Sequence, residues 1–408
     1  MSGGACFLGP FPIGSLPVTV PTDYVGMHFR GWPITNPAFQ QEVVFPQTVS
    51  PSPNAMGFGS TRLHDSGFCN WYQIEATQSV YTWTNLDTIV TAHRQAGRTI
   101  IFELLGAPQF YIANADANKL VNDSYAVKGG KCYPGATVAI EGVDGLAGLT
   151  NFITALVTRY NAAGGAWRLA NPTLGRGLDK IECWNEAFNV GSDFYIGSVA
   201  QLVDIAYTIR TAAKSVDASI VVLSPSSNDI NLLVDWLGTS GAINTTKKGS
   251  DGCDALAVHS YNVMLPYTSM ANYTSDCLTG YYKGYFQIRN RLNTLYPTLP
   301  VYITESGIGY DFTNPAAGMA LAIAATPDWR FKFWARMLML GAAFGYKCWQ
   351  TYCWERPFSC NAYADPNGIQ KALTTVHTKV GGKTITAASY TVGGEVALTF
   401  SDLTTLII

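Results

Sequence analysis

Eight short apolar runs alternate with segments of helical periodicity along most of this 408-residue chain. Continuously apolar runs are typical of strands covered on both faces, whereas apolar residues three and four apart form one side of a helix. The expected strands are residues 25–29, 59–64, 99–105, 180–186, 220–224, 255–259, 301–305 and 346–354. The expected helices are 81–97 (after a turn), 146–160, 199–215, 231–237, 282–296 and 327–344. This order predicts an α/β fold, specifically a (β/α)8 TIM barrel.

A doubly wound parallel sheet is the rival α/β architecture. It would require a glycine-rich phosphate-binding turn after the first strand. The residues there, from Gly26 through Arg30 to Gly31, do not form such a turn. The barrel is therefore favoured.

The last fifty residues change character. Short strand-like runs at 376–380, 383–389, 395–400 and 404–408 are separated by Gly381-Gly382 and Gly393-Gly394, a pattern typical of hairpins. We expect three parts: a segment 1–23 that packs with a β appendage, a catalytic barrel at 24–356, and the small β appendage at 357–408. The part of the first segment expected to complete the appendage is 7–20.

Charge is scarce and balanced. Charged residues make up 13% of the chain, about half the usual share of about 25%, and the net charge is −2. A surface that follows phosphates needs clustered Lys and Arg, so we expect no nucleic-acid partner. No apolar run approaches the length of a membrane span, so we expect no membrane insertion. The first residues lack the basic and apolar regions of a signal peptide.

Nine cysteines leave at least one thiol free in a monomer. Their spacing contains no Cys-x-x-Cys pair, and the sequence determines neither their pairing nor the oligomeric state. No cofactor is indicated.

Two glutamates follow strand-like runs in different parts of the chain. Glu186 ends Trp184-Asn185-Glu186, and Glu305 lies in Ile303-Thr304-Glu305. Two carboxylates that face one cavity are the minimum for glycoside hydrolysis, because one protonates the leaving oxygen and the other attacks or activates water. Each glutamate alone could merely end a strand. The pair makes Glu186 and Glu305 the expected catalytic residues.

Other polar and aromatic residues lie at or just beyond the expected strand ends, where such barrels meet substrate. We expect Arg62 beside Glu305, with Tyr261 donating to it, and His259 orienting substrate or a carboxylate. Trp71, Tyr111 and Trp354 are expected to offer flat faces for sugar rings. The full substrate-binding set is Asn185, Arg62, His64, His28, His259, Tyr261, Trp349, Trp354 and Trp71.

These strings resemble retaining clan A glycoside hydrolases with (β/α)8 barrels, most closely glycoside hydrolase family 39. The resemblance covers about residues 24–356 and rests on Trp184-Asn185-Glu186, Ile303-Thr304-Glu305 and His259-x-Tyr261. Thr61-Arg62-Leu63-His64-Asp65 and Phe102-Glu103-Leu104-Leu105-Gly106-Ala107-Pro108 support it. The resemblance implies that Glu186 is the acid/base and that Glu305 is the nucleophile. We expect no metal site.

The sequence thus predicts a retaining glycosidase acting on an oligo- or polysaccharide. Low charge and many aromatics favour endo action on an exopolysaccharide or similar glycan. An exo-acting β-xylosidase-like enzyme and a non-catalytic carbohydrate-binding barrel remain alternatives. A metal-dependent hydrolase is only weakly supported, because the chain has just five histidines. A serine hydrolase is not supported, because the chain has no Gly-x-Ser-x-Gly motif. The substrate class favours a secreted or extracellular location.

Overall fold

The computed structural model contains two compact units, each described below by itself. One comprises Met1–Phe29, Pro46–Ser60 and Ser260–Ile408, and the other comprises Arg30–Phe45 and Thr61–His259. The structure describes residues 16–29, 58–64, 70–111, 120–122, 128–130, 145–188, 195, 197–261, 290–292, 294–307, 327–352, 367–390 and 395–408. Within these ranges, no helix is both long and apolar enough to cross a membrane.

Eight strands form the main sheet, in the order β10-β11-β12-β2-β3-β4-β8-β9. Their bounds are β2 Val25–His28, β3 Ser60–Leu63, β4 Thr99–Glu103, β8 Lys180–Glu182, β9 Val221–Leu223, β10 Leu256–Tyr261, β11 Val301–Gly307 and β12 Trp349–Thr351. Parallel registers join β11 to β12, β12 to β2, β4 to β8 and β8 to β9. Parallel bridges Leu223–Ala255 and Ser227–Val258 connect the two ends of that order. The predicted (β/α)8 barrel is confirmed.

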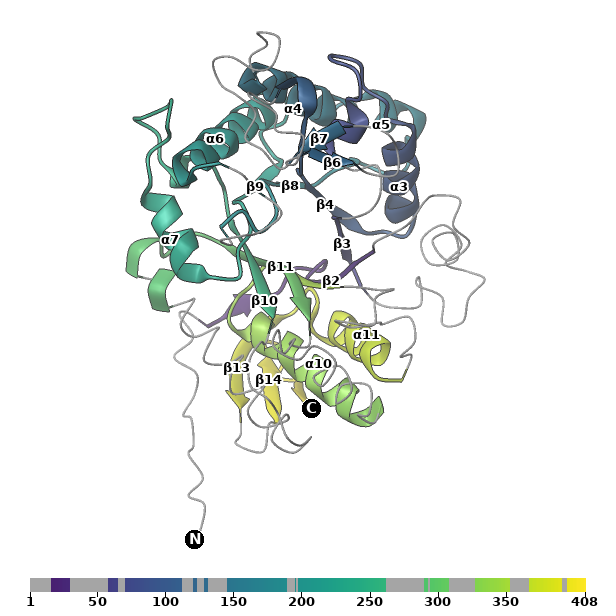
Figure 1. Cartoon of the computed structure of the whole chain (residues 1–408). Coiled ribbons are helices and arrows are strands. Elements are labelled where there is room, and N and C mark those ends of the chain that lie inside the picture. Colours follow the sequence, from purple (N-terminus) through teal and green to yellow (C-terminus); the bar gives the residue numbers. More distant parts are fainter. Residues whose placement is uncertain are drawn as a thin grey trace. The chain divides into compact units, whose positions relative to one another are not determined.

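The helices of the second unit follow from apolar spacing and capping. They are α2 Trp71–Ile74, α3 Thr84–Gln95, α4 Gly145–Tyr160, α5 Ala166–Ala170, α6 Val199–Val216 and α7 Ile230–Gly238. Figure 1 shows α3, α4 and α6 on the outer side of β4, β8 and β9. Helix α6 begins at Ser198, whose side chain accepts from the backbone N–H of Gln201 while the Gln201 side chain accepts from that of Ser198. This reciprocal cap satisfies two otherwise unpaired donors.

The register between β4 and β8 places two carboxylates side by side. Glu103 pairs with Glu182, and both are buried. Adjacent buried carboxylates require cationic partners, because burial disfavours the charged form. Those partners belong to the site described below.

Three short strands between residues 107 and 130 form a second small sheet. Its strands are β5 Ala107–Pro108, β6 Leu120–Asn122 and β7 Lys128–Gly130, and β7 pairs with both others in antiparallel register. The short 3-10 helix Gln109–Tyr111 follows β5. The strands are two or three residues long, too short for a periodic pattern to predict.

In the first unit, α10 Pro327–Ala343 packs closely on strand β12. A Cβ at Gly341 would lie 2.5 Å from the ring of Trp349, so this contact requires glycine. The hydroxyl of Tyr24 donates to the carbonyl of Leu338 at 2.8 Å. Trp349 therefore forms part of the core between strand and helix.

An antiparallel sheet of order β1-β13-β14-β15 forms the predicted β appendage. Its strands are β1 Val18–Thr19, β13 Thr384–Tyr390, β14 Val396–Phe400 and β15 Thr405–Ile407. Val18 pairs with Ile385, so part of the segment 7–20 does join this sheet. The domain limits 1–23, 24–356 and 357–408 remain a proposal.

The strand expected at 376–380 is wrong, because these residues end helix α11, Ile369–Val380. Its buried apolar residues Ile369, Ala372, Leu373, Val376 and Val380 are three or four apart and follow one side of a helix. The five residues 376–380 are too few to show this helical spacing on their own. Helix α11 packs against α10. The helix expected at 282–296 lies largely outside the described residues.

Candidate active site

Polar side chains from four strands of the second unit meet at the strands' carboxyl ends. They come from β3, β4, β8 and β10 and from the residues that directly follow β3 and β8. All are buried except Glu186, whose side chain keeps 19% of its surface exposed. The members are Arg62, His64, Glu103, Glu182, Asn185, Glu186 and His259. A buried cluster with one accessible carboxylate can act chemically at that carboxylate.

Glu186 is held by a histidine. Nδ1 of His259 lies 2.8 Å from Oε1 of Glu186, and the His259 side chain is fully buried. Burial alone would raise the pKa of Glu186. The hydrogen bond and charge of His259, with the charges of His64 and Arg62, outweigh burial and lower that pKa below its ordinary value. Glu186 is therefore ionised more readily than an ordinary glutamate.

The backbone around Glu186 is strained. Trp184 and Glu186 adopt φ values of 91° and 41°, in the region that L-residues rarely occupy. The backbone N–H of Ser226 donates to the carbonyl of Trp184 at 3.0 Å, and that of Glu186 donates to Oγ of Ser226 at 3.0 Å. Strain of this kind costs about 1–3 kcal/mol per residue and persists where surrounding contacts enforce it. Ser226 supplies two such contacts.

Arg62 organises the interior of the cluster. Its Nε and Nη2 donate to the two oxygens of Glu182 at 2.9 and 2.7 Å, a bidentate pair. Nη2 also donates to Oδ1 of Asn185 at 2.8 Å. Because arginine can only donate, this bond assigns the oxygen of the Asn185 amide and leaves the amide nitrogen as its donor. The expected position of Arg62 beside Glu305 remains a prediction.

Glu103 and His64 form a second buried pair. Nδ1 of His64 and Oε2 of Glu103 are in hydrogen-bonding contact. Burial raises the pKa of Glu103, and the charges of His64 and Arg62 partly oppose it. The contact fixes the ring of His64 near the same strand ends. Its predicted role in substrate binding remains a proposal.

Glu305 lies on β11 in the first unit and is buried. Next to it, Oγ of Ser306 donates to the carbonyl of Gln350 and accepts from the indole N–H of Trp349 at 2.8 Å. These contacts tie the chain around Glu305 to β12. The pairing of Glu305 with Glu186 remains a prediction.

Three aromatic residues expected to meet substrate lie in the core instead. Trp71 is fully buried, stacks on Tyr111 and Phe152, and donates from its indole nitrogen to Glu75 at 2.6 Å. Tyr111 is 1% exposed and donates to the same carboxylate. Trp349 is fully buried against α10. None of the three offers a free face to a sugar.

The remaining predicted residues are placed as follows. His28 is buried on β2. Its ring and that of Tyr352 make a T-shaped contact, with centroids 4.7 Å apart. Tyr261 ends β10, and its side chain lies outside the description. Trp354 lies outside the described residues.

Sequence reasoning missed Glu182 as a member of the site. Glu182 was treated as part of a strand-like run, although a carboxylate inside a strand covered on both faces signals a buried cation. Within the described ranges, no group of three or more His, Cys, Asp or Glu side chains is arranged to hold a metal ion.

The structure is similar to several solved glycoside hydrolases. A monomeric β-xylosidase from Caulobacter crescentus CB15 matches with a TM-score of 0.53 and 16% identity over 93% of this chain and 74% of that one. A family 51 α-L-arabinofuranosidase from Bifidobacterium longum matches with a TM-score of 0.54, 12% identity and coverages of 94% and 76%. The catalytic domain of the family 30 xylanase C from Talaromyces cellulolyticus matches with a TM-score of 0.52 and 14% identity over 96% of this chain and 84% of that one.

Comparison with family models finds no match, and neither does comparison with curated proteins. At such identities the structural similarity establishes the shared barrel fold. The activity of this chain must be argued from its own residues.

Proposed function

We propose that this chain is a retaining O-glycosyl hydrolase that cleaves a polysaccharide by double displacement. The observation that carries the proposal is Glu186, a partly exposed carboxylate at a strand end, held by His259 and by a strained backbone. Similarity in fold to xylosidases, a xylanase and an arabinofuranosidase supports the same reaction class.

In the first step, a carboxylate oxygen of Glu305 attacks the anomeric carbon while Glu186 transfers its proton to the glycosidic oxygen. The bond between that oxygen and the anomeric carbon breaks, and the leaving sugar departs as an alcohol. In the second step, Glu186 takes a proton from water, the water oxygen attacks the anomeric carbon, and Glu305 is released as a carboxylate. Both steps invert, so the configuration is retained.

The other predicted residues bind rather than react. The amide nitrogen of Asn185 donates to a sugar hydroxyl, because its oxygen is occupied by Arg62. His259 positions Glu186, and His64, His28 and Tyr261 contact the sugar nearest the cleaved bond. Because the pKa of Glu186 is lowered, its proton-donating form is populated only in acid, below the range in which an ordinary glutamate titrates.

We further propose endo action on an exopolysaccharide or similar glycan. The similarity to a xylanase supports this preference, whereas the similarity to a β-xylosidase supports the exo-acting alternative. The discriminating assay offers soluble polysaccharides and aryl monosaccharides in parallel, with products identified by mass spectrometry. Internal cleavage yields a ladder of oligosaccharides, whereas efficient hydrolysis of aryl xyloside with release of single sugars contradicts endo action.

The mechanism is tested by NMR of the first-formed product. The expected outcome is an anomer of the same configuration as the substrate. An inverted product contradicts double displacement. Binding of glycans without any turnover instead favours the non-catalytic barrel.

A further inference from the structure

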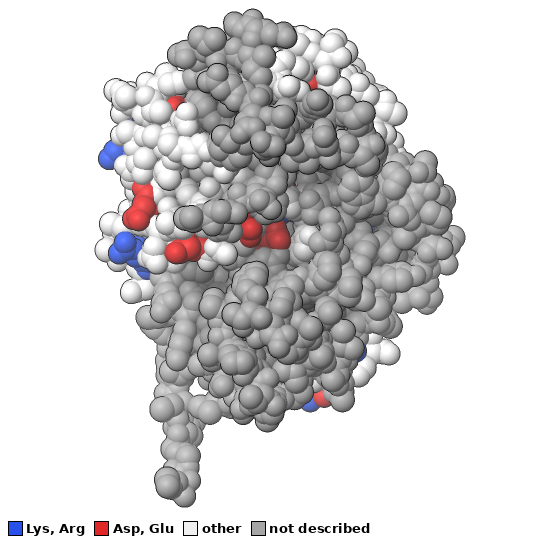
Figure 2. Space-filling view, viewed as in Figure 1, with Lys and Arg blue, Asp and Glu red and all other residues white. Residues whose placement is uncertain are grey.

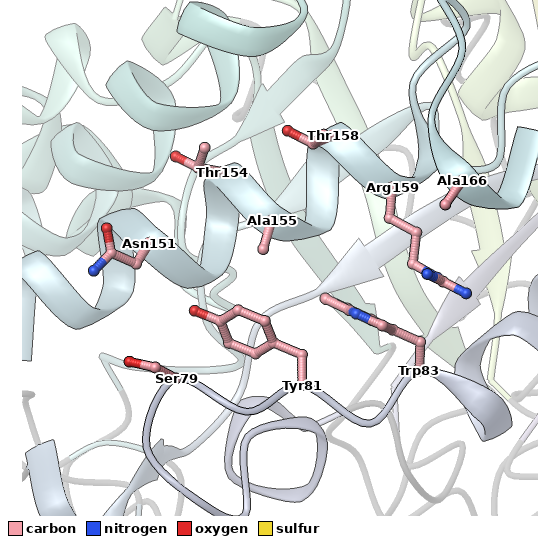
Figure 3. Close-up of a pocket in the computed structure, with 9 residues that line it drawn as sticks. All are labelled: Ser79, Tyr81, Trp83, Asn151, Thr154, Ala155, Thr158, Arg159 and Ala166. Atoms are coloured by element: carbon pink, nitrogen blue, oxygen red, sulfur yellow. The ribbon is translucent and has the colours of Figure 1, made fainter.

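A groove in the second unit lies apart from the strand-end cluster, between the segment 79–83 that leads into α3 and the side of α4. We call it the α3–α4 groove. Its larger part has a volume of about 540 Å³, within the range of about 300–1,000 Å³ of ligand pockets. Figure 3 shows Tyr81 and Trp83 on one wall and Asn151, Thr154 and Thr158 on the facing helix. None of these residues belongs to the candidate active site.

The groove has a smaller part beside the larger one. This second pocket, of about 350 Å³, shares Arg159 and Ala166 with the first and is lined along α3 to Gln95 and along α5 to Asn171. The two neighbouring pockets, with Arg159 at their common boundary, follow one line along the surface. That shape suits a chain-like ligand better than a small compact one.

The chemistry of the lining is aromatic and neutral. Tyr81 and Trp83 are half-buried, with ring centroids 5.5 Å apart and planes inclined by 43°. Among the described residues that line one or other of the two pockets, the charged side chains are Arg159, which lines both, and Asp87, which lines the smaller one. They neutralise each other, since Nε of Arg159 donates to Oδ1 of Asp87 at 2.8 Å and Nη2 contacts Oδ2. The remaining polar groups are hydroxyls, amides and the indole N–H groups of Trp83 and Trp167.

The aromatic wall is fixed before any ligand arrives. The ring of Trp83 lies against Phe152 and Tyr160, and the guanidinium carbon of Arg159 is 5.6 Å from its centroid. Arg159 is itself fixed by Asp87, which also accepts from the hydroxyl of Tyr160 at 2.7 Å. A preformed surface loses little side-chain entropy on binding.

The lining of the groove gives no reason to expect a charged ligand, because its Arg159 and Asp87 pair with each other. On the one face drawn in Figure 2, the Lys and Arg atoms of the described residues form only small separate spots. A phosphorylated or strongly acidic ligand would require a continuous positive field. Aromatic faces with hydroxyl and amide groups instead match the C–H faces and hydroxyls of neutral sugars.

We propose that the α3–α4 groove is a second, non-catalytic carbohydrate-binding site that holds a stretch of neutral polysaccharide. The identity of that polysaccharide as the enzyme's own substrate rests on the proposed function. The groove then keeps the chain attached while the strand-end site acts on another stretch of it. Linking two sites in this way raises the effective concentration of substrate without any new catalytic contact.

The test compares groove variants with matched surface variants. Trp83→Ala and Tyr81→Ala remove the aromatic wall, and Thr154→Arg fills the groove from the facing helix without disturbing the rings. Trp329→Ala, at a half-buried tryptophan stacked on Phe333, and Tyr207→Ala, at a half-buried tyrosine, are the controls. Thermal unfolding of each variant verifies that it is folded.

Retention is measured by electrophoresis in gels that contain soluble xylan, xyloglucan or glucomannan, and hydrolysis is measured on each polymer and on its trisaccharide. We expect the groove variants to bind polymer about three- to tenfold more weakly and to lose activity on polymer alone. The control variants should match the wild type in both assays.

The outcomes separate this inference from the proposed function. If all variants show equal retention and equal polymer hydrolysis, the proposed carbohydrate-binding role of the groove is wrong, while the hydrolysis still supports the proposed enzyme activity. Retention that depends on Trp83, without any hydrolysis, upholds the groove and contradicts the enzyme. A wild-type protein that none of the three polymers retains also overturns the groove.

Discussion

His259 stands between two carboxylates: Nδ1 lies 2.8 Å from Oε1 of Glu186, and Nε2 lies 4.0 Å from Oε1 of Glu182. Glu182 is already bound in two places by Arg62. The histidine therefore connects the exposed carboxylate to the buried ion pair. A change at any of the three groups reaches Glu186 electrostatically, and this underlies the first prediction.

The pH dependence should follow the pKa of Glu186. The profile of kcat/KM reports the pKa values of the free enzyme. As general acid Glu186 must be protonated, so activity should fall as the pH rises through its lowered pKa, on the acidic side of neutrality. His259→Gln removes the charge that lowers this pKa, so the falling limb should move to higher pH. His377→Gln, on α11, is the control. An unmoved limb in His259→Gln contradicts the role of His259.

The two proposed catalytic glutamates should fail differently. Glu186→Ala should lose about 10²–10⁴-fold on substrates with poor leaving groups, because general acid help is lost. Good leaving groups should still form the glycosyl-enzyme, and azide should restore turnover. Glu305→Ala should form no covalent intermediate in mass spectrometry. Near wild-type rates on polymer in both variants would show the assignment to be wrong.

Ser226 should act as a positioning residue. Ser226→Ala removes the acceptor for the backbone N–H of Glu186. We expect kcat to fall on the order of ten- to a hundredfold with little change in KM, because small misplacements of a reacting group are costly. Ser224→Ala is the matched control, since Oγ of Ser224 accepts from the N–H of Ala257 in the same region. An equal loss in both variants would indicate a general packing defect.

Trp71 should matter for stability and not for binding. Trp71→Ala should lower the free energy of unfolding by about 3–5 kcal/mol, the range for truncating a large buried aromatic. Trp71→Phe retains the stacking on Tyr111 and Phe152 and should lose less. Denaturant unfolding measures both. A KM increase for trisaccharide in folded Trp71→Phe would restore its role as a sugar platform.

Asp254 should make the free energy of unfolding depend on pH in the acidic range. It accepts from the N–H of Val222 and pairs with Lys214 and Arg210, which lower its pKa against the opposing effect of burial. Because the folded pKa lies below the unfolded one, its contribution is present above the unfolded pKa and is lost as the pH falls through the folded pKa. Asp254→Asn should cost about 1–2 kcal/mol at neutral pH, after allowance for partial exposure, and little in strong acid. The exposed Asp235→Asn should show no such trend in denaturant titrations.

The alternation of apolar runs and helical periods was sufficient to predict the barrel, because each strand and helix carries its own pattern. Helix α6 was predicted as 199–215 and spans Val199–Val216. The strand expected at 376–380 was wrong, because five residues beside a glycine pair resemble a strand when the preceding turns are ignored. Strands of two or three residues, such as β5, carry no period at all.

The sequence indicated Glu186 as a strand-end carboxylate, but it did not indicate Glu182 or the contacts within the site. A glutamate after an apolar run marks a strand end, and that rule located Glu186. Burial is a property of the folded chain, so sequence could not separate Trp71 in the core from Trp83 at the surface. Nor could it assign Arg62 to Glu182.

The Arg62–Glu182 pair has a consequence for how this sequence can evolve. Loss of one partner leaves a buried charge uncompensated, at about 3–5 kcal/mol, whereas replacing both with apolar residues can be nearly neutral for folding. Asn185 also depends on Arg62, so the neutral double exchange would still release its amide. Substitution of Arg62 is therefore constrained both by Glu182 and by Asn185. Lineages that keep a working site should retain Arg62, Glu182 and Asn185 together.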